Sequence, residues 1–229
     1  MTYEAKKRAL LTFMLAIIYN TSIKVNRERG IYMTQQAAVM DFVRNGNGMI
    51  TTAKAVEKGI SRGVLGYMVQ KGTLLRVSRG VYALPEVWED EFLNLQSQFK
   101  RGIFSHATAL FLWDLTDRAP LVYYMTFPTN YNLSNPKREG IRCFQAKQEL
   151  YSLGAESTNS PAGNSVRCYS AERTLCDILR PNYDSDIQMI TEAYKRYAQR
   201  SQKNVPLLSE YAQRLGVEKR VRAYLEVLL

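Results

Sequence analysis

The sequence is poor in the side chains that bind metals and carry out catalysis. Its 229 residues include one histidine, His106, and three cysteines, Cys143, Cys168 and Cys176, with no CxxC pair. Three scattered cysteines indicate a reducing compartment, and a zinc site would need widely separated ligands. The chain also has no GxxxxGK[ST] phosphate-binding loop and no HExxH zinc motif. We therefore predict a cytoplasmic protein without a metal, a cofactor or an enzymatic activity.

Long hydrophobic runs are missing as well. The apolar stretch at residues 9–19 follows three basic residues, but it is shorter than the roughly 20 residues of a membrane span and no small-residue cleavage site follows it. We expect no membrane contact. Residues 1–33 are predicted to be a helical N-terminal extension, and a natural translation start at Met33 remains an open alternative.

Positive charge is concentrated in the first part of the chain. Residues 1–85 hold 13 Lys/Arg and 4 Asp/Glu, a net charge of +9, whereas residues 86–229 hold 18 and 17, a net charge of +1. This distribution indicates a basic module that binds phosphate groups, joined to a nearly neutral module with another task.

Within the basic part, residues 50–72 have the pattern of two short helices joined by a tight turn. Thr51 is suited to cap a helix over residues 52–58, and Gly59 ends it. Ser61 is suited to cap a second helix with one apolar face, which Gly72 ends. This spacing is typical of a helix-turn-helix, whose second helix lies in the major groove of DNA.

A hairpin is predicted directly after these helices. Residues 74–77 and 81–84 are β-prone, and Gly80 can adopt the positive φ of the tight turn at residues 78–80. With a further helix over residues 34–44, the segment 34–85 is predicted to be a winged helix-turn-helix. The alternative is three small elements of another domain, with arginines on a solvated face.

If the winged interpretation holds, the second helix reads bases and the hairpin grips phosphates. Arg62 could reach guanine, and Gly63 and Gly66 would let the backbone approach DNA closely. The predicted DNA-binding residues are Lys54, Ser61, Arg62, Gly63, Tyr67, Gln70, Lys71, Arg76, Ser78 and Arg79.

Residues 86–229 are predicted to form a mixed α/β domain ending in a helical tail, which makes the whole chain α+β. The expected helices cover residues 87–99, 105–115, 171–179, 184–202, 206–215 and 218–228; the expected strands cover 121–127, 140–146 and 164–169, with a loop at 157–163. His106, Arg173 and Asp177 are the candidate functional residues here. The alternatives are a structural histidine and an ordinary i,i+4 ion pair.

Three segments together resemble the AbiEi antitoxins of bacterial abortive-infection systems over residues 34–229. They are GISR at 59–62 with GTLLRVSRGVYA at 72–83, FSHATAL at 104–110, and SAERTLCD at 170–177. The chain departs from the family pattern in lacking a proline after Ser170 and in the glycines at 63 and 66.

The resemblance implies a two-part role in phage defence. The first domain would bind inverted repeats in the promoter of its own operon and repress it. The C-terminal domain, residues 86–229, would counteract a nucleotidyltransferase-like toxin without a stable complex, as in type IV toxin-antitoxin systems. The alternatives are a transcription regulator whose second domain senses a ligand, and a second domain that acts as an enzyme on nucleic acids or nucleotides.

Overall fold

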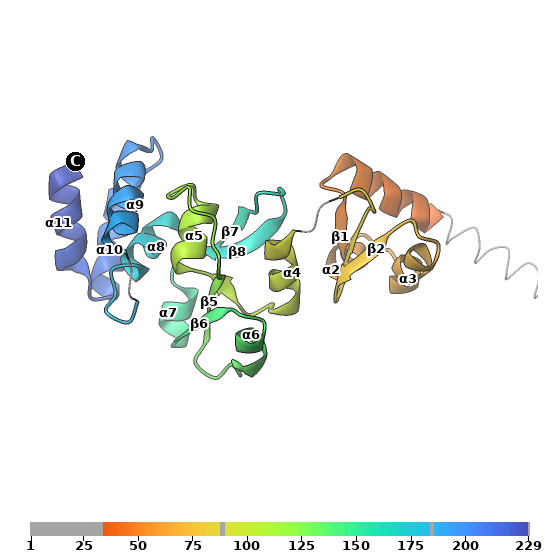
Figure 1. The fold of residues 1–229 in the computed structure, drawn as a ribbon, viewed down its shortest axis with the longest axis horizontal. Helices are drawn as coiled ribbons and strands as arrows, with labels where there is room; N and C mark the ends of the chain where they lie inside the picture. Colours follow the sequence, from red (N-terminus) through yellow and green to blue (C-terminus); the bar gives the residue numbers. More distant parts are fainter. Residues whose placement is uncertain (1–33, 88–89, 184–185, 229) are drawn as a thin grey trace, which may run out of the picture. The chain divides into compact units, whose positions relative to one another are not determined.

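The computed structural model describes residues 34–87, 90–183 and 186–228 (Figure 1). The predicted helix within residues 1–33 lies outside this range. The chain folds as two compact units, Met1–Glu89 and Asp90–Leu229, which we call the N-terminal and C-terminal units. Each unit combines helices with its own sheet, so the α+β class is confirmed.

The N-terminal unit begins, in its described part, with a helix over residues 34–45. Its remaining elements are β1 (Met49–Thr51), α2 (Thr52–Glu57), α3 (Arg62–Gln70), β2 (Leu75–Ser78) and β3 (Val81–Ala83). The three strands form an antiparallel sheet in the order β1-β3-β2. Strand β1 was not expected from the sequence, because three residues are too few to show an alternating pattern.

Local chemistry explains why α2 and α3 start and stop where they do. The Thr51 hydroxyl accepts a hydrogen bond from the amide of Lys54 at 3.1 Å, and the Ser61 hydroxyl accepts one from the amide of Gly63 at 3.3 Å. Gly59, with a φ of +72°, ends the α2 segment in a conformation that other residues rarely adopt. The predicted caps and stop are confirmed.

One apolar core holds this unit together. The helix over residues 34–45, α2 and α3 each turn one apolar face toward the sheet, as their residue spacing predicts. The core comprises Val39, Val43, Ile50, Ala55, Ile60, Val64, Leu65, Met68, Leu74 and Leu84.

The C-terminal unit is built on a five-stranded mixed sheet in the order β6-β5-β4-β8-β7. These strands are β4 (Ile103–Phe104), β5 (Tyr124–Pro128), β6 (Arg142–Ala146), β7 (Ala155–Asn159) and β8 (Ser165–Tyr169). Phe92 and Leu95 of helix α4 (Glu91–Gln98) belong to one apolar cluster with Met125 of β5 and Cys168 of β8. Tyr151 of helix α7 (Gln148–Ser152) belongs to another apolar cluster with Ile103 of β4.

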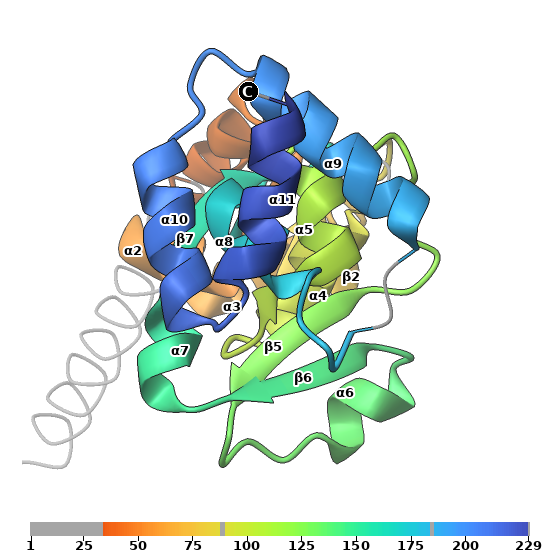
Figure 2. The ribbon, with the colours of Figure 1, turned by 90° about the vertical axis from the view of Figure 1, so that its left-hand side faces the viewer.

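The remaining helices are α5 (His106–Leu112), α6 (Ser134–Arg138), α8 (Ala171–Asp177), α9 (Ile187–Gln199), α10 (Val205–Arg214) and α11 (Glu218–Leu228) (Figure 2). All seven residues of α8 are buried. Three of them, Ala171, Leu175 and Cys176, form a second apolar core with residues of α5, α9, α10 and α11, including Leu110, Tyr194, Leu208 and Val221.

Several boundaries differ from the predictions. Residues 157–159, expected in a loop, belong to β7, an edge strand whose sequence AESTN is polar and therefore resembles a loop. Helix α4 starts at Glu91 and not at residue 87, because the Asp90 carboxylate accepts a hydrogen bond from the amide of Leu93 and caps it there. The short elements β4, α6 and α7 were not expected.

None of the helices formed by the described residues combines the length and the apolar character needed to cross a lipid bilayer.

Candidate nucleic-acid interface

Helix α3 is divided into a buried face and an exposed face. Val64, Leu65 and Met68 are buried, whereas the predicted DNA-facing residues Ser61, Arg62, Gly63, Gly66, Tyr67 and Gln70 are all exposed. The Tyr67 side chain is a large hydrophobic group with 41% exposure. The sequence therefore predicted correctly which side of α3 meets the core and which side meets solvent.

The turn before α3 is held by a residue that sequence reasoning missed. The side-chain oxygen of Gln35 accepts a hydrogen bond from the amide of Ser61 at 3.1 Å, and its nitrogen donates to the carbonyl of Gly59 at 3.4 Å. Gln35 lies more than twenty residues earlier, in the helix over residues 34–45. A polar residue near a helix start carries no signal that would identify its partner.

The same turn has the sequence motif GxSxG at residues 59–63, which is the motif of the nucleophile elbow of serine hydrolases. That elbow is a strained turn from a strand into a helix. Here the turn follows helix α2, and Ser61 has an unstrained φ of −65° with its hydroxyl engaged in capping α3. His106 belongs to the other unit. The segment is therefore a helix-to-helix turn and does not have the geometry of a nucleophile elbow.

The hairpin β2–β3 exposes two arginines. Arg76 pairs with Tyr82 in the ladder, and a register shift separates it from Ser78. Arg79 lies in the turn with Gly80, whose φ is +83°. Both arginine side chains are exposed, and so is Arg62 on α3. Among the ion pairs formed within the described residues, none includes any of these three arginines.

The two predicted lysines have neighbours within the unit. Lys54 forms an ion pair with Glu57 at 2.9 Å on the exposed side of α2. The Lys71 ammonium lies 5.7 Å from the centre of the Tyr67 ring, a cation–π distance. Exposed contacts of this kind are weak. Both lysines therefore remain able to exchange these partners for a phosphate.

In the C-terminal unit, Arg173 is buried and bonded to neighbouring residues of the fold. Its side chain is 1% exposed, and its Nε donates to the Asp177 carboxylate at 2.9 Å. One guanidinium nitrogen donates to the carbonyls of Leu150 and Leu153, and the guanidinium carbon lies 4.4 Å from the centre of the Tyr169 ring. The predicted i,i+4 pair is present, but it is buried and not an ordinary surface pair.

His106 is also buried and sits among aromatic rings. Its ring stacks on Phe144 at 3.9 Å and lies 4.5 Å from Tyr183. Its Nδ1 is 3.0 Å from the hydroxyl of Ser105, which occupies the N-cap position of α5 without capping it. Burial lowers the pKa of His106 to about 4; the charge of Asp177 opposes this shift. The histidine is therefore neutral near pH 7.

The electrostatic neighbours of His106 include Asp177, Arg173 and Arg180, so the three candidate residues of this unit do lie in one region. One oxygen of Asp177 has no hydrogen-bond partner, although Arg180 lies 3.6 Å from it. No described group of His, Cys, Asp and Glu side chains could hold a metal ion. All three side chains of this cluster are buried.

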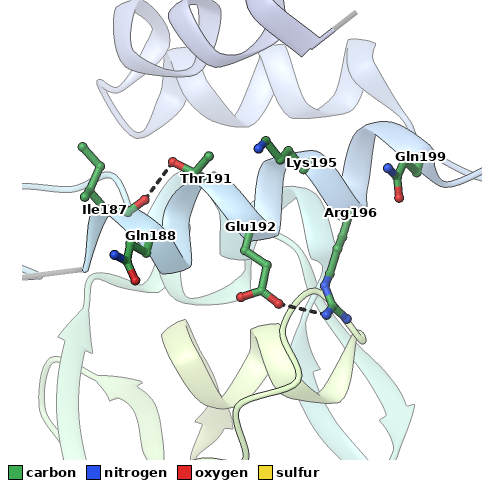
Figure 3. A pocket seen from close by; sticks show the side chains of 7 residues that line it. All are labelled: Ile187, Gln188, Thr191, Glu192, Lys195, Arg196 and Gln199. Atoms are coloured by element: carbon green, nitrogen blue, oxygen red, sulfur yellow. Dashed lines mark hydrogen bonds and ion pairs between the residues drawn. The ribbon is translucent and has the colours of Figure 1, made fainter.

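A shallow surface pocket of this unit lies along one helix. Ile187, Thr191, Glu192 and Arg196 line it together with other residues of α9, and Figure 3 shows the Glu192–Arg196 ion pair at its edge. Because all lining residues come from one face of a single helix, nothing converges on a bound molecule from opposite sides. We assign no function to this pocket.

One comparison with known proteins gives a family match, and it lies within the N-terminal unit. Residues 38–85 match the family model described as transcriptional regulator, AbiEi antitoxin, which confirms the predicted family resemblance for this part of the chain. No curated protein matches the chain. Among solved structures, the chain is similar to the crystal structure of the RV2827C protein from Mycobacterium tuberculosis, with 15% identity, 84% of this chain and 81% of that chain covered, and a TM-score of 0.41. So low a score supports no further conclusion.

Proposed function

We propose that this chain, whose residues 38–85 match the AbiEi antitoxin family of transcriptional regulators, is an autorepressor that binds double-stranded DNA through a winged helix-turn-helix. In this proposal α2 and α3 are the helix pair, and the hairpin β2–β3 is the wing. The operator consists of inverted repeats in the promoter of its own operon.

One observation carries the proposal: Arg62, Arg76 and Arg79 are exposed on α3 and the hairpin, and no ion pair among the described residues includes them. Arginines that are not neutralised by carboxylates are available to phosphates and to the acceptor edge of guanine. Residues 34–85 hold seven Lys/Arg against two Asp/Glu, so the surrounding field also favours a polyanion.

The different roles of Arg62 and Arg79 follow from their positions. Arg62 is the first residue of α3, where a recognition helix usually contacts base edges. Arg79 lies in the hairpin turn, from which a side chain meets the phosphate backbone or the minor groove. Arg62 therefore selects sequence, and Arg79 contributes affinity for DNA of any sequence.

The experiment measures binding of the full chain to a duplex selected by the wild-type protein from a random pool, and to a scrambled duplex. Arg62→Ala should reduce the preference for the selected duplex by roughly 1–3 kcal/mol. Arg79→Ala should weaken both complexes about equally and reduce the salt slope by about 1.

Arg44→Ala is the matched control, because Arg44 is an exposed arginine of the same unit on the helix over residues 34–45. It should leave the preference for the selected duplex unchanged. If Arg62→Ala and Arg79→Ala both bind like the wild type, the assignment of α3 and the hairpin to DNA is wrong.

We further propose that the C-terminal unit carries an antitoxin activity against a nucleotidyltransferase-like toxin, without a stable complex. The family matched by residues 38–85 is described as antitoxins, and the segments at 104–110 and 170–177 of the C-terminal unit resemble the same family. Expression of the toxin encoded beside this gene should arrest growth, and co-expression of this chain should restore it. An Arg62→Ala variant should still restore growth when it is expressed from a foreign promoter, because neutralisation does not use the DNA surface. Continued arrest with the wild-type chain would contradict the antitoxin role.

A further inference from the structure

The side chain of Gln35 joins the first helix of the N-terminal unit to the turn that precedes α3. Its amide contacts both ends of a three-residue segment, the Gly59 carbonyl at 3.4 Å and the Ser61 amide at 3.1 Å. A primary amide offers a donor and an acceptor in a fixed plane. It can therefore bridge a carbonyl and an N–H group that lie two residues apart.

The residue between these two ends is fixed from the opposite side. Ile60 is 4% exposed and belongs to the core, and its amide donates to the carbonyl of Ala55 at 2.8 Å. Ile60 thus anchors the turn to the core, while the Gln35 amide hydrogen-bonds the turn on its exposed side. Together these contacts determine the position of Ser61, which caps α3.

We propose that Gln35 is a positioning residue for sequence recognition: its amide fixes the start of α3, and therefore the direction in which Arg62 projects toward DNA. This inference rests on the proposed function and adds to it a residue outside the surface that touches DNA. A displacement of about 1 Å is enough to lose a bidentate contact with a base. A contact with a phosphate tolerates the same displacement, because it needs proximity more than alignment.

The bridge contributes more to geometry than to stability. Both of its hydrogen bonds lie at an exposed site, where water can replace the amide as a partner. Loss of the bridge should therefore lower the melting temperature by only about 3 °C. A residue that merely stabilised the fold would instead weaken binding to all DNA in proportion to the fraction unfolded.

The test uses Gln35→Met in the full chain, because methionine keeps the length of the side chain and removes both hydrogen bonds. The matched control is Gln36→Met. Gln36 is the next residue of the same helix and is also half-buried, and no hydrogen bond of its side chain occurs within the described residues. Gln35→Glu retains the acceptor for the Ser61 amide but cannot donate to Gly59, so it should give partial rescue.

The first readout is amide hydrogen exchange, which does not require DNA. Gln35→Met should accelerate exchange of the Ser61 amide about tenfold or more, whereas Gln36→Met should not. The second readout is the ratio of affinities for the selected duplex and a scrambled duplex. This ratio should fall about tenfold in Gln35→Met, while the affinity for the scrambled duplex and its salt slope stay unchanged. Adding Arg62→Ala to Gln35→Met should reduce the ratio less than Arg62→Ala reduces it in the wild type.

Each outcome has a distinct meaning. Unchanged Ser61 exchange in Gln35→Met would overturn the bridge itself. Faster exchange with an unchanged affinity ratio, or with equal losses on both duplexes, would overturn the positioning role. If the wild-type chain shows no preference for any duplex, the proposed function fails together with the positioning role, and an exchange effect would then identify a purely structural bridge.

Discussion

Two arginines on two helices illustrate how differently the units of this protein use the same side chain. Arg62 begins α3 on an exposed face, and no described carboxylate forms an ion pair with it. Arg173 lies within α8, is 1% exposed, and donates to one carboxylate and two carbonyls. The first has its donors available to another molecule, whereas the donors of the second are engaged in the fold.

This difference separates a binding surface from a structural network. Buried charges must be paired and hydrogen-bonded, because an unpaired charge in an apolar interior is very costly. Exposed charges have no such requirement and contribute little to stability. An exposed charge without an internal partner is therefore available to another molecule, whereas a buried and hydrogen-bonded charge is committed to the fold.

The largest expected effect comes from breaking the buried network. Arg173→Ala should destabilise the C-terminal unit by about 3–5 kcal/mol, because it leaves the Asp177 carboxylate and the carbonyls of Leu150 and Leu153 without their donor. Chemical denaturation of the full chain, followed by tryptophan fluorescence, measures this loss.

Arg222→Ala provides the control for that prediction. Arg222 forms an i,i+4 pair with Glu218 at 2.8 Å, but its side chain is 65% exposed. Its loss should cost less than about 0.5 kcal/mol. Equal costs for the two variants would mean that burial does not distinguish these ion pairs.

A smaller effect is expected from the titration of His106. Its pKa is about 4 in the folded chain against 6.5 when exposed, so between these values the unfolded chain binds a proton that the folded chain does not. Stability is therefore full above pH 6.5 and is lost as the pH falls, by about 2 kcal/mol between pH 7 and pH 5. Denaturation midpoints across this range measure the slope.

The variant His106→Asn tests the origin of this slope. Asparagine tolerates the left-handed backbone at this position, where φ is +50°. The variant should be less stable at every pH, because it loses the packing on Phe144 and Tyr183. Its stability should nevertheless change little between pH 7 and pH 5. An undiminished slope would assign the pH dependence to other groups.

The sequence predicted the N-terminal unit better than the C-terminal unit, for a physical reason. Capping and turn formation depend on neighbouring residues, so Thr51, Gly59, Ser61 and Gly80 were identified correctly from local chemistry. The exposed face of α3 followed from periodicity alone. Gln35 was missed because its partners lie at Gly59 and Ser61, a pairing that only the folded chain creates.

Long-range contacts also explain the errors in the C-terminal unit. Strand β7 is polar, and residues 157–159 of it have the sequence pattern of a loop, because its strand character comes from pairing with β8 and not from its own residues. The burial of Arg173 could not be inferred from its i,i+4 spacing. Its additional partners, Leu150 and Leu153, lie about twenty residues earlier in the chain.

The smallest predicted effect contrasts stability with binding on α3 itself. Gly66 is exposed within this helix, and an added methyl group would meet no atom within 4 Å. Gly66→Ala should therefore stabilise the N-terminal unit by about 0.5–1 kcal/mol, because alanine loses less conformational freedom in a helix. If this face lies against DNA, the same methyl group should weaken binding to the selected duplex.

Gly59→Ala should instead destabilise the unit by about 1 kcal/mol, because its φ is +72° although the space around it is also open. A Gly66→Ala variant that is more stable and binds DNA as tightly as the wild type would show that α3 does not approach DNA at this position.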